Sequence, residues 1–243
     1  KVVSLEEKFE LFEEADNMCM KSWPEFILHD PVSFNNWATF IEAYKKYQLV
    51  ILEGDIIVAA INTIPLQYDE KIEDLPEGGW DWGVTKAIDD LKKGRKPNVL
   101  LGVQIVVNSD YQGKGISSFA TSQMRNLIIK YNLEKLIIPV RPNKKCNYPL
   151  IEMKEYVKWK NKDGFAFDNW LRVHEKSGGK IIKVCKKAMN IEGTIDEWIK
   201  WTGKEFPGSG DYIVEGSLNP VSINLEKNQG IYIEPNVWVV YDN

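Results

Sequence analysis

Hydrophobic and polar positions follow two rhythms along the 243-residue chain, one helical and one extended. Apolar side chains recur every three to four residues over 5–19 and again over 37–47, which predicts two helices near the start. Ser4 and Glu7 have the spacing of a capping box, so we expect the first helix to begin there. Pro31 lies between the two helical patterns and separates them.

An extended pattern follows these helices. Two runs rich in β-branched residues, 48–53 and 56–64, flank a Gly-Asp dipeptide, and this arrangement predicts a β-hairpin. The next segment, 67–97, is polar and glycine-rich and carries Trp80 and Trp82. We interpret it as an insertion over one face of the fold, with a short helix near 86–93.

The central part of the chain has the clearest pattern. An apolar run at 99–107 is followed by an amphipathic helix at 116–131 and a second apolar run at 136–140. Strand, helix and strand in this order predict a βαβ unit with parallel strands and a right-handed crossover. Pro139, near the end of the second strand, predicts either an edge strand or a place where the two strands splay apart.

The C-terminal part mixes both rhythms. We expect helices at 150–161, at 168–177 with Asp168 as N-cap, and at 194–202, and strands at 181–185, 212–214, 220–225 and 231–241. No internal repeat or linker divides the chain. The pattern predicts one α/β (α+β) domain over residues 1–243, with a core to about 190 and a strand-rich extension over 191–243.

Composition and charge narrow the class of protein. Apolar residues make up 44% of the chain and charged residues 27%, which excludes a disordered or collagen-like protein. The net charge of −4 argues against a nucleic-acid-binding protein with a broad basic face. No apolar run reaches the length of a membrane span and no secretory signal is visible, so we expect a cytoplasmic protein without nucleic-acid or membrane partners.

The rarer residue types point to substrate binding rather than to metal chemistry. Three cysteines lie far apart and outside any CxxC spacing, which predicts free thiols and neither disulfides nor a zinc site. Only two histidines are present, so no metal centre is expected. The nine tryptophans indicate either an aromatic core or the walls of a substrate cleft, for which the candidates are Trp80, Trp82 and Trp170.

Candidate chemistry is concentrated in a glycine-rich loop, residues 111–117, between a predicted strand and a predicted helix. The first turn of a helix has unpaired N–H groups and a positive partial charge, and glycines let the backbone approach an anion closely. We therefore expect the loop to bind a pyrophosphate. A Walker A loop is excluded because glycine follows Lys114, and a dinucleotide fingerprint fits poorly because Ser118 replaces its third glycine.

A known family has a similar loop. The segment Gln112-Gly113-Lys114-Gly115-Ile116-Ser117 resembles the Gln/Arg-x-x-Gly-x-Gly/Ala loop with which the GCN5-related N-acetyltransferase (GNAT) superfamily binds the acyl-CoA pyrophosphate. The order of elements is also similar, and residues 173–179 resemble the family's Leu-Tyr-Glu-Lys-Leu-Gly-Phe segment. The resemblance covers about 5–184 and implies a central mixed sheet flanked by helices, with two insertions. It implies that acetyl-CoA is the co-substrate and binds Ile105, Val106, Val107 and the loop from Gln112 to Ser117.

The resemblance also implies a mechanism, in which an amine attacks the thioester directly in a ternary complex. His174 stands at the position of the family tyrosine that assists the departing thiolate. An unperturbed pKa of about 6.5 would give the imidazole both its neutral and its protonated form at neutral pH. The alternative is that His174 only packs at the end of the helix. Asp168 and Glu234 are candidates for the base, although an N-cap and an edge-strand carboxylate are their ordinary interpretations. The fourth strand offers only Gln104, which cannot titrate.

The resemblance places the adenosine end of CoA near Lys144 and Lys145, which we expect to be exposed and to contribute modestly to binding. The sequence thus predicts an N-acetyltransferase that acts on a small-molecule or peptide amine. Two alternatives stay open: a non-catalytic acyl-CoA-binding or sensory module on the same fold, and a tryptophan-rich interaction protein. The acceptor, the acyl chain length and the oligomeric state, including a homodimer, stay open too.

Overall fold

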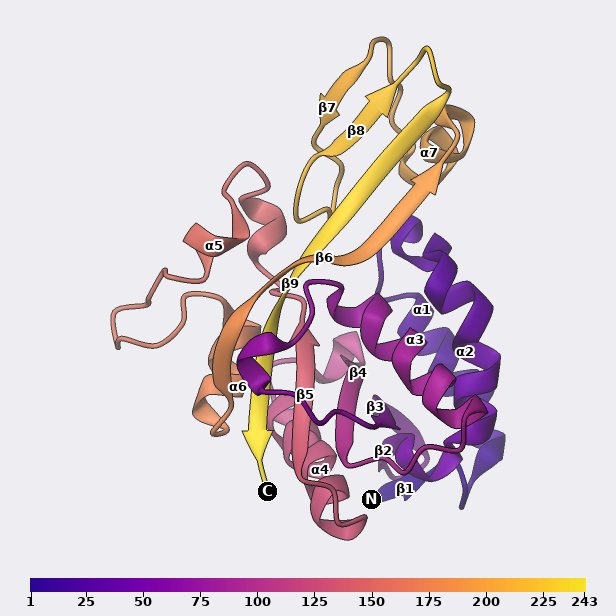
Figure 1. Ribbon diagram of the computed structural model, residues 1–243, viewed down its shortest axis with the longest axis vertical. Coiled ribbons are helices and arrows are strands. Elements are labelled where there is room, and N and C mark those ends of the chain that lie inside the picture. Colours follow the sequence, from indigo (N-terminus) through magenta and orange to yellow (C-terminus); the bar gives the residue numbers. More distant parts are fainter.

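The computed structural model describes residues 1–243 and contains a nine-stranded mixed sheet between two layers of helices (Figure 1). The strands follow the order β1-β2-β3-β4-β5-β9-β8-β7, and β6 pairs with β9. The strands are β1 (Val2–Ser4), β2 (Leu49–Glu53), β3 (Ile56–Leu66), β4 (Val99–Val107), β5 (Lys135–Val140), β6 (Lys180–Gly193), β7 (Gly210–Tyr212), β8 (Val221–Asn224) and β9 (Gln229–Asp242). The helices are α1 (Phe12–Met20), α2 (Pro31–Ala43), α3 (Gly79–Lys92), α4 (Ile116–Lys130), α5 (Met153–Tyr156), α6 (Asn169–Lys176) and α7 (Ile195–Thr202). This architecture confirms the predicted fold class.

The capping-box residues at the start of the chain close a turn and do not begin a helix. The Ser4 backbone N–H donates to the Glu7 carboxylate at 2.8 Å, and the Glu7 N–H donates to the Ser4 hydroxyl at 3.3 Å. Ser4, however, is the last residue of β1, where it pairs with Leu49 of β2. The predicted helix start is therefore wrong, and α1 begins only at Phe12.

The predicted hairpin and βαβ unit are both present, and they define the centre of the sheet. β2 and β3 pair antiparallel, whereas β4 and β5 run parallel. β4 and β5 are paired only over 99–101 and 135–137, so they separate beyond Leu101 and Ile137. The predicted splay at Pro139 is thus confirmed, but the edge alternative is wrong because the same residue pairs with Trp238 of β9.

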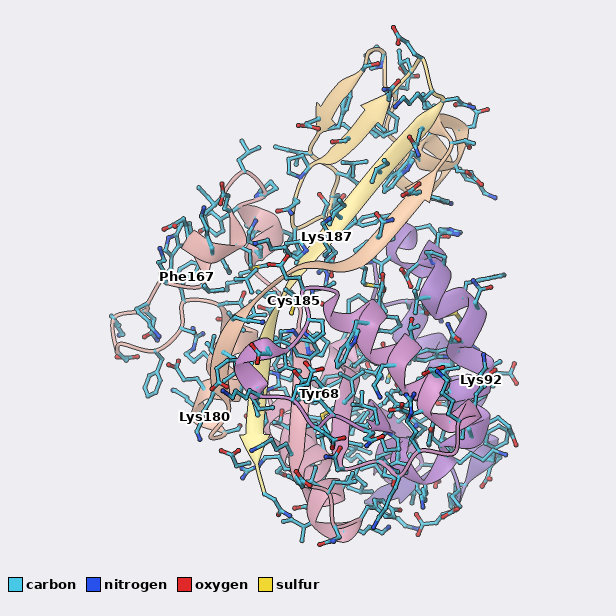
Figure 2. The ribbon with its side chains drawn as sticks, viewed as in Figure 1. Tyr68, Lys92, Phe167, Lys180, Cys185 and Lys187 are labelled. Atoms are coloured by element: carbon cyan, nitrogen blue, oxygen red, sulfur yellow. The ribbon has the colours of Figure 1, made fainter.

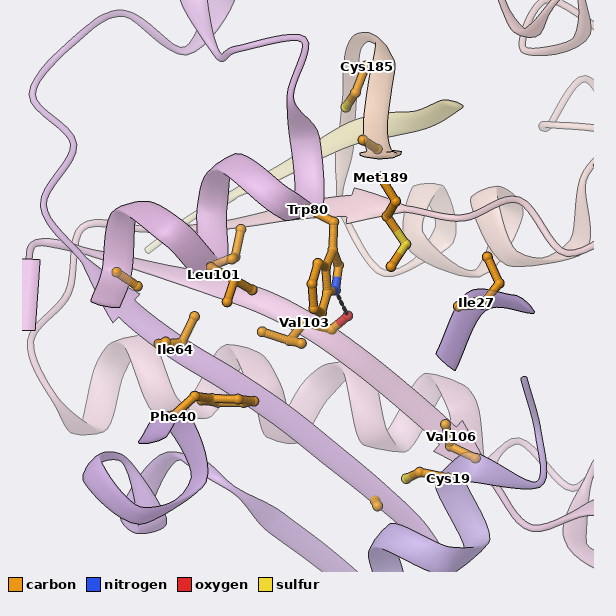
Figure 3. Close-up of a cluster of buried hydrophobic side chains, with 14 of the residues drawn as sticks. Cys19, Ile27, Phe40, Ile64, Trp80, Leu101, Val103, Val106, Cys185 and Met189 are labelled. Atoms are coloured by element: carbon orange, nitrogen blue, oxygen red, sulfur yellow. Dashed lines mark hydrogen bonds between the residues drawn. The ribbon is translucent and has the colours of Figure 1, made fainter. Parts of the chain in front are cut away.

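A β-bulge in β4 lies where this separation begins. Asn62 pairs with Gln104 and Thr63 pairs with Gly102, which leaves Val103 unpaired with β3. The Val103 carbonyl instead accepts a hydrogen bond of 3.0 Å from the Trp80 indole (Figure 3). A bulge bends its strand and frees one backbone group, so α3 both packs on β4 and satisfies its freed carbonyl.

Helices cover the two faces of the sheet separately. α1, α2 and α3 pack on one face, and they lie together along one side of Figure 1. α4 and α6 pack on the other face. α3 is longer than the short helix expected within 67–97, because it begins at Gly79 and buries an apolar stripe formed by Trp80, Val84, Ala87 and Ile88.

The predicted helix at 150–161 is wrong for most of its length. Only α5 is helical there, and the chain then folds back through a bridge between Lys160 and Ala166. The rings of Tyr148, Trp159 and Phe167 pack edge to face at 5.0–5.9 Å (Phe167 is labelled in Figure 2). These aromatic residues pack on one another, which favours a folded-back segment over a continuous helix.

The long strand β9 connects the central strands of the sheet to the C-terminal strands β8 and β7. One side of β9 pairs with β6 from Gly230 to Val240. Its other side pairs with β8 up to Ile231 and with β5 from Val237 onward, which leaves residues 232–236 between these partners. β9 belongs to the extension expected from 191 to 243, and the division of the domain at about residue 190 stays a prediction.

Candidate functional site

A cleft of about 860 Å³ passes through the gap between β4 and β5. One part, here called the loop arm, is lined by the end of β4, the loop before α4 and one side of α6: Ile105, Val106, Val107, Tyr111, Gln112, Gly113, Gly115, Ile116, Ser117, Ser118, Asn169, Trp170, Val173 and His174. The other part, here called the tryptophan arm, is lined by residues from the N-terminal, central and C-terminal parts of the chain: Asp16, Cys19, Met20, Trp23, Ile27, Phe34, Trp37, Trp80, Arg141, Met189, Glu234 and Asn236.

The loop arm presents backbone N–H groups to open space. Gly113 and Gly115 have φ angles of +76° and +79°, which strain any residue with a Cβ. Gly115 is the N-cap of the 15-residue helix α4, whose first turn contains no acidic residue and whose N-cap provides no side-chain bond. A Cβ added at either glycine would meet no protein atom within 4 Å. The unpaired N–H groups of the helix start and the open space above them fit a pyrophosphate.

Most residues expected to bind the co-substrate line this arm. Ile105, Val106 and Val107, together with Gln112, Gly113, Gly115, Ile116 and Ser117, all border the cleft. Lys114 does not, and its ammonium lies 4.4 Å from the centre of the Tyr111 ring. The structure thus brings the expected set together with this one exception.

His174 of α6 borders the loop arm and is completely buried. Its Nδ1 lies 2.8 Å from the Tyr241 hydroxyl, whereas its Nε2 has no hydrogen-bond partner. Burial lowers the pKa of His174 to about 3, so the imidazole is neutral at pH 7. This corrects the expectation that both protonation states are available there. A role through a neutral Nε2 atom is compatible with the geometry.

Asp168 lies outside the cleft, where it is 1% exposed and acts as the N-cap of α6. Its carboxylate accepts from the backbone N–H groups of Trp170, Leu171 and Lys144 and from the Tyr156 hydroxyl, at 2.8–3.1 Å. The expectation of a general base is corrected here, because these four bonds occupy the carboxylate and the cleft does not reach it.

The expectation of two exposed lysines after β5 is wrong for Lys145. Its side chain is completely buried, and its ammonium donates to the carbonyls of Tyr148, at 2.8 Å, and Leu218. Burial lowers the pKa of Lys145 to about 8. Neither Lys144 nor Lys145 borders the cleft. The role of Lys145 is to connect the segment after β5 to residue 218.

Glu234 borders the tryptophan arm but is paired with a cation. Both of its oxygens accept from Arg141 Nε, at 2.9 and 3.0 Å, and one accepts from the Tyr232 hydroxyl at 2.9 Å. The side chain is 1% exposed. Glu234 pairs with Met189 of β6 on one side and lies between β8 and β5 on the other, so the edge-strand interpretation holds for its backbone, although its side chain is buried. The structure makes it the counter-ion of Arg141 and not a free base.

The tryptophan arm contains a carboxylate that the sequence analysis missed. Asp16 on α1 borders the cleft, and its Oδ1 accepts from the Trp37 indole at 3.0 Å. Burial raises the pKa of Asp16 above its ordinary value. A signal was present in the sequence, since Asp16 lies within the apolar stripe of α1 between Phe12 and Cys19.

Gln104, the residue of β4 that cannot titrate, is fixed in the same arm. Its side-chain oxygen accepts from the Trp23 indole at 2.9 Å, and its amide donates to Asn62 at 2.8 Å. Of the three tryptophans expected to form walls, Trp80 and Trp170 border the cleft. Trp82 instead packs between Tyr68 and Trp238 in the core.

Two further carboxyl groups meet behind the tryptophan arm. Asp30 caps α2 by accepting from the Ser33 N–H at 2.7 Å, and Asp81 of α3 accepts from the Asn190 N–H at 3.2 Å. Asp30 Oδ1 and Asp81 Oδ1 are both buried without a hydrogen-bond partner, and each carboxylate charge disfavours ionisation of the other. Burial, followed by the charge of the neighbouring carboxylate, raises the pKa of Asp81. The pair links the start of α2 to α3.

Other features of the chain concern metal, disulfide and membrane chemistry. No three His, Cys, Asp or Glu side chains are grouped as metal ligands would be. The three cysteines are unpaired. No helix combines the length and the apolar character needed to cross a bilayer. The cytoplasmic location stays a prediction.

Known proteins resemble this chain in fold and in sequence. No family model matches the chain. An arginine N-acetyltransferase, avaD, from Aspergillus versicolor is 30% identical, over 96% of this chain and 89% of the relative. The loading GNATL domain of CurA from Lyngbya majuscula has a TM-score of 0.64 at 17% identity, covering 100% of this chain and 96% of that domain. An aminoglycoside 6'-N-acetyltransferase complexed with coenzyme A has a TM-score of 0.50 at 10% identity, covering 100% and 96%.

The two structural matches show the fold, and the sequence match covers nearly the whole of both chains. Together with the glycine-rich loop at the start of α4 and the separated strands β4 and β5, they account for the architecture and for the class of enzyme. This chain belongs to the GCN5-related N-acetyltransferase superfamily and is an N-acetyltransferase.

Proposed function

We propose that this enzyme moves the acetyl group of acetyl-CoA to a nitrogen of a small cationic acceptor of the arginine type, with both substrates bound together. The observation that carries the proposal is a single cleft through the β4–β5 gap, with unpaired backbone N–H groups in one arm and aromatic rings with a carboxylate in the other. The relative from Aspergillus versicolor, named for arginine, supports the acceptor class.

The loop arm suits the co-substrate. The N–H groups of residues 115–118 have no partner within α4, and the helix dipole adds a positive partial charge. Together with the loop N–H groups from Gly113 onward, they give the pyrophosphate its donors. The thioester then extends along Ile105–Val107 of β4, whose pairing with β5 has ended. This path brings the sulfur toward His174, which borders the cleft and whose Nε2 has no hydrogen-bond partner in the protein.

The tryptophan arm suits a cation. Trp23, Trp37 and Trp80 border it, and a cation over an indole face is attracted by the ring. Asp16 supplies a negative charge beside Trp37. Because Glu234 already neutralises Arg141, Asp16 is the carboxylate available to an acceptor cation or to its proton.

The transfer itself needs little covalent chemistry from the protein. The acceptor nitrogen attacks the carbonyl carbon, a C–N bond forms, and the C–S bond breaks with its electron pair on the sulfur. The excess proton of the nitrogen passes to Asp16, directly or through water. Burial raises the pKa of Asp16 and makes it a stronger base than an ordinary aspartate. Holding both substrates in one cleft supplies the remaining rate enhancement through proximity.

Thiol release from acetyl-CoA tests this proposal, with arginine, agmatine, lysine and citrulline as acceptors and mass spectrometry of the products. We expect release with arginine, and release at least about tenfold slower with citrulline, because its uncharged side chain loses the cation–π and carboxylate contacts. The Gly113→Val variant is the negative control. Absence of release with every amine would refute the transferase proposal, and equal rates with arginine and citrulline would refute the cation recognition alone.

A further inference from the structure

The surroundings of His174 determine which of its ring nitrogens carries the proton. The ring is neutral and completely buried, so it has one N–H donor and one acceptor nitrogen. Nδ1 lies 2.8 Å from the hydroxyl of Tyr241 on β9, Nε2 has no hydrogen-bond partner in the protein, and the residue borders the cleft. The direction of the hydroxyl proton therefore decides whether Nε2 is a donor or an acceptor toward a bound substrate.

The Tyr241 hydroxyl has two possible acceptors, which differ in distance and in their other partners. The backbone carbonyl of His174 lies 3.2 Å from this hydroxyl. The same carbonyl already accepts from the Gly179 N–H at 2.8 Å and shares the Ser177 N–H, at 3.1 Å, with the Val173 carbonyl at 3.0 Å. Nδ1 lies at 2.8 Å and is the nearer acceptor, so the hydroxyl proton is directed to Nδ1.

A neighbouring cation strengthens this direction. The Arg125 guanidinium donates to the Ser177 carbonyl at 2.9 Å and lies 5.2 Å from the centre of the Tyr241 ring. A positive charge beside a phenol makes its hydroxyl a better donor and disfavours a second cation on the adjacent imidazole. Burial raises the pKa of Tyr241 well above its ordinary value, so the hydroxyl keeps its proton.

We propose that Tyr241 is a positioning residue that fixes His174 in the tautomer with its proton on Nε2, so that the ring points an N–H donor at the sulfur of the departing CoA. The part of this inference that concerns the sulfur rests on the proposed function. Tyr241 donates to Nδ1, and Nε2–H donates a hydrogen bond without losing its proton. Such a bond strengthens as negative charge develops on sulfur, so it accelerates the bond-breaking step more than it strengthens binding.

The tautomer is measurable without any activity. The chain has only two histidines, so ¹⁵N-histidine labelling and two-bond ¹H–¹⁵N correlation give two ring patterns, and a His29→Gln variant assigns them. We expect His174 to show a protonated Nε2 and an unprotonated Nδ1 from pH 5.5 to 8.5. Acetyl-CoA should shift the Nε2–H proton. A proton on Nδ1 of His174 in the wild-type enzyme would overturn the proposal, whatever the acceptor proves to be.

Steady-state kinetics of Tyr241→Phe provide the second readout. We expect kcat to fall about 3- to 10-fold, the scale of one lost hydrogen bond, while the KM for acetyl-CoA stays within about twofold. Tyr68→Phe is the matched control, because it also removes one tyrosine hydroxyl, which donates to the Lys71 carbonyl and lies outside the cleft. An unchanged kcat in a folded Tyr241→Phe enzyme, or the same loss of kcat in Tyr68→Phe, would reject the positioning role.

Discussion

The two arms of the cleft differ in the groups that they offer to a ligand: backbone N–H groups in the loop arm and side chains in the tryptophan arm. The anion-binding side of the loop arm consists mainly of backbone, supplied by residues 105–118 in one continuous stretch that ends one strand and begins one helix, and α6 forms the other side. The tryptophan arm consists of side chains from α1, α2, α3, β6, β9 and the segments between them, which are up to 220 residues apart in the sequence. A site that holds an anion with backbone N–H groups requires only the correct local conformation. A site that holds a cation between aromatic rings and a carboxylate requires side chains that only the complete fold brings together.

The two arms therefore differ in what a substitution does to them. In the loop arm, side-chain identity matters mostly where a Cβ would occupy the space of the ligand. In the tryptophan arm, each side chain has a contact of its own, such as Trp23 to Gln104 or Trp37 to Asp16. The following predictions test whether this distinction between backbone and side-chain sites holds.

The largest effect is expected from Gly113→Val and Gly115→Val. Both should weaken acetyl-CoA binding by more than about 100-fold, because several charge-assisted hydrogen bonds of about 1.5–3 kcal/mol each are lost when a side chain fills the anion site. Gly94→Val is the matched control, since Gly94 also has a positive φ and open space around it but lies outside the cleft. Isothermal titration measures the affinities, and wild-type affinity in the loop variants would remove the loop from the site.

A smaller loss is expected from Asp16→Asn. We expect turnover to fall by about 10²-fold, the usual scale for a lost general base, with acetyl-CoA affinity unchanged. Glu13→Gln, on the exposed side of the same helix, should leave both quantities unchanged. Steady-state rates and titrations separate the two effects. A loss of acetyl-CoA affinity in Asp16→Asn would mean that the two arms are not distinct.

Lys145→Met tests the side-chain bonds that hold the segment after β5. The substitution leaves the carbonyls of Tyr148 and Leu218 without their donor, so the free energy of unfolding should fall by about 1–3 kcal/mol. Lys144→Met should change it by less than about 0.5 kcal/mol, because the bond to Asp168 comes from its backbone N–H. Denaturant unfolding of both variants gives the comparison. Equal stabilities would contradict the structural role of Lys145.

The last prediction concerns pH and the carboxyl pair formed by Asp30 and Asp81. Burial, together with the Asp30 charge, raises the pKa of Asp81 to about 8, so the folded state holds a proton that the unfolded state releases near pH 4. The stabilisation is complete below pH 4 and is lost as the pH rises through 8. The Tm of Asp81→Asn minus that of the wild type should therefore increase from pH 5 to pH 8. In the control Asp89→Asn, where Lys93 lowers the pKa of the wild-type carboxyl, this difference should stay flat over the same range.

The sequence predicted the loop arm well because its determinants are local. The strand at 99–107, the glycines at 113 and 115 and the helix from 116 are adjacent, and each follows from periodicity or turn chemistry. The splay at Pro139 was predictable for the same reason. The side chain of Lys114 lies outside the cleft, which a pattern of glycines could not indicate because it does not say which way a flexible side chain points.

The tryptophan arm could not be predicted in the same way. Glu234 was selected by residue type, but the fold pairs it with Arg141, whereas Asp168, which lies outside the arm, is the helix N-cap that the sequence also predicted. Lys145 was expected at the surface, and only the return of residue 218 buries it. Asp16 was missed because its importance depends on the position of Trp37, which lies 21 residues away. These partners meet only through tertiary contacts.

A crystal structure of the CoA complex tests the central claim most directly, namely that two distinct arms meet in the gap between β4 and β5. We predict the pyrophosphate on the backbone N–H groups of Gly113 to Ser117 and the sulfur in the gap beside Gly102 and Ile138, facing His174 Nε2. The tryptophan arm would then stay open for the acceptor. A pyrophosphate bound away from this loop, or a sulfur outside the gap, would contradict the account.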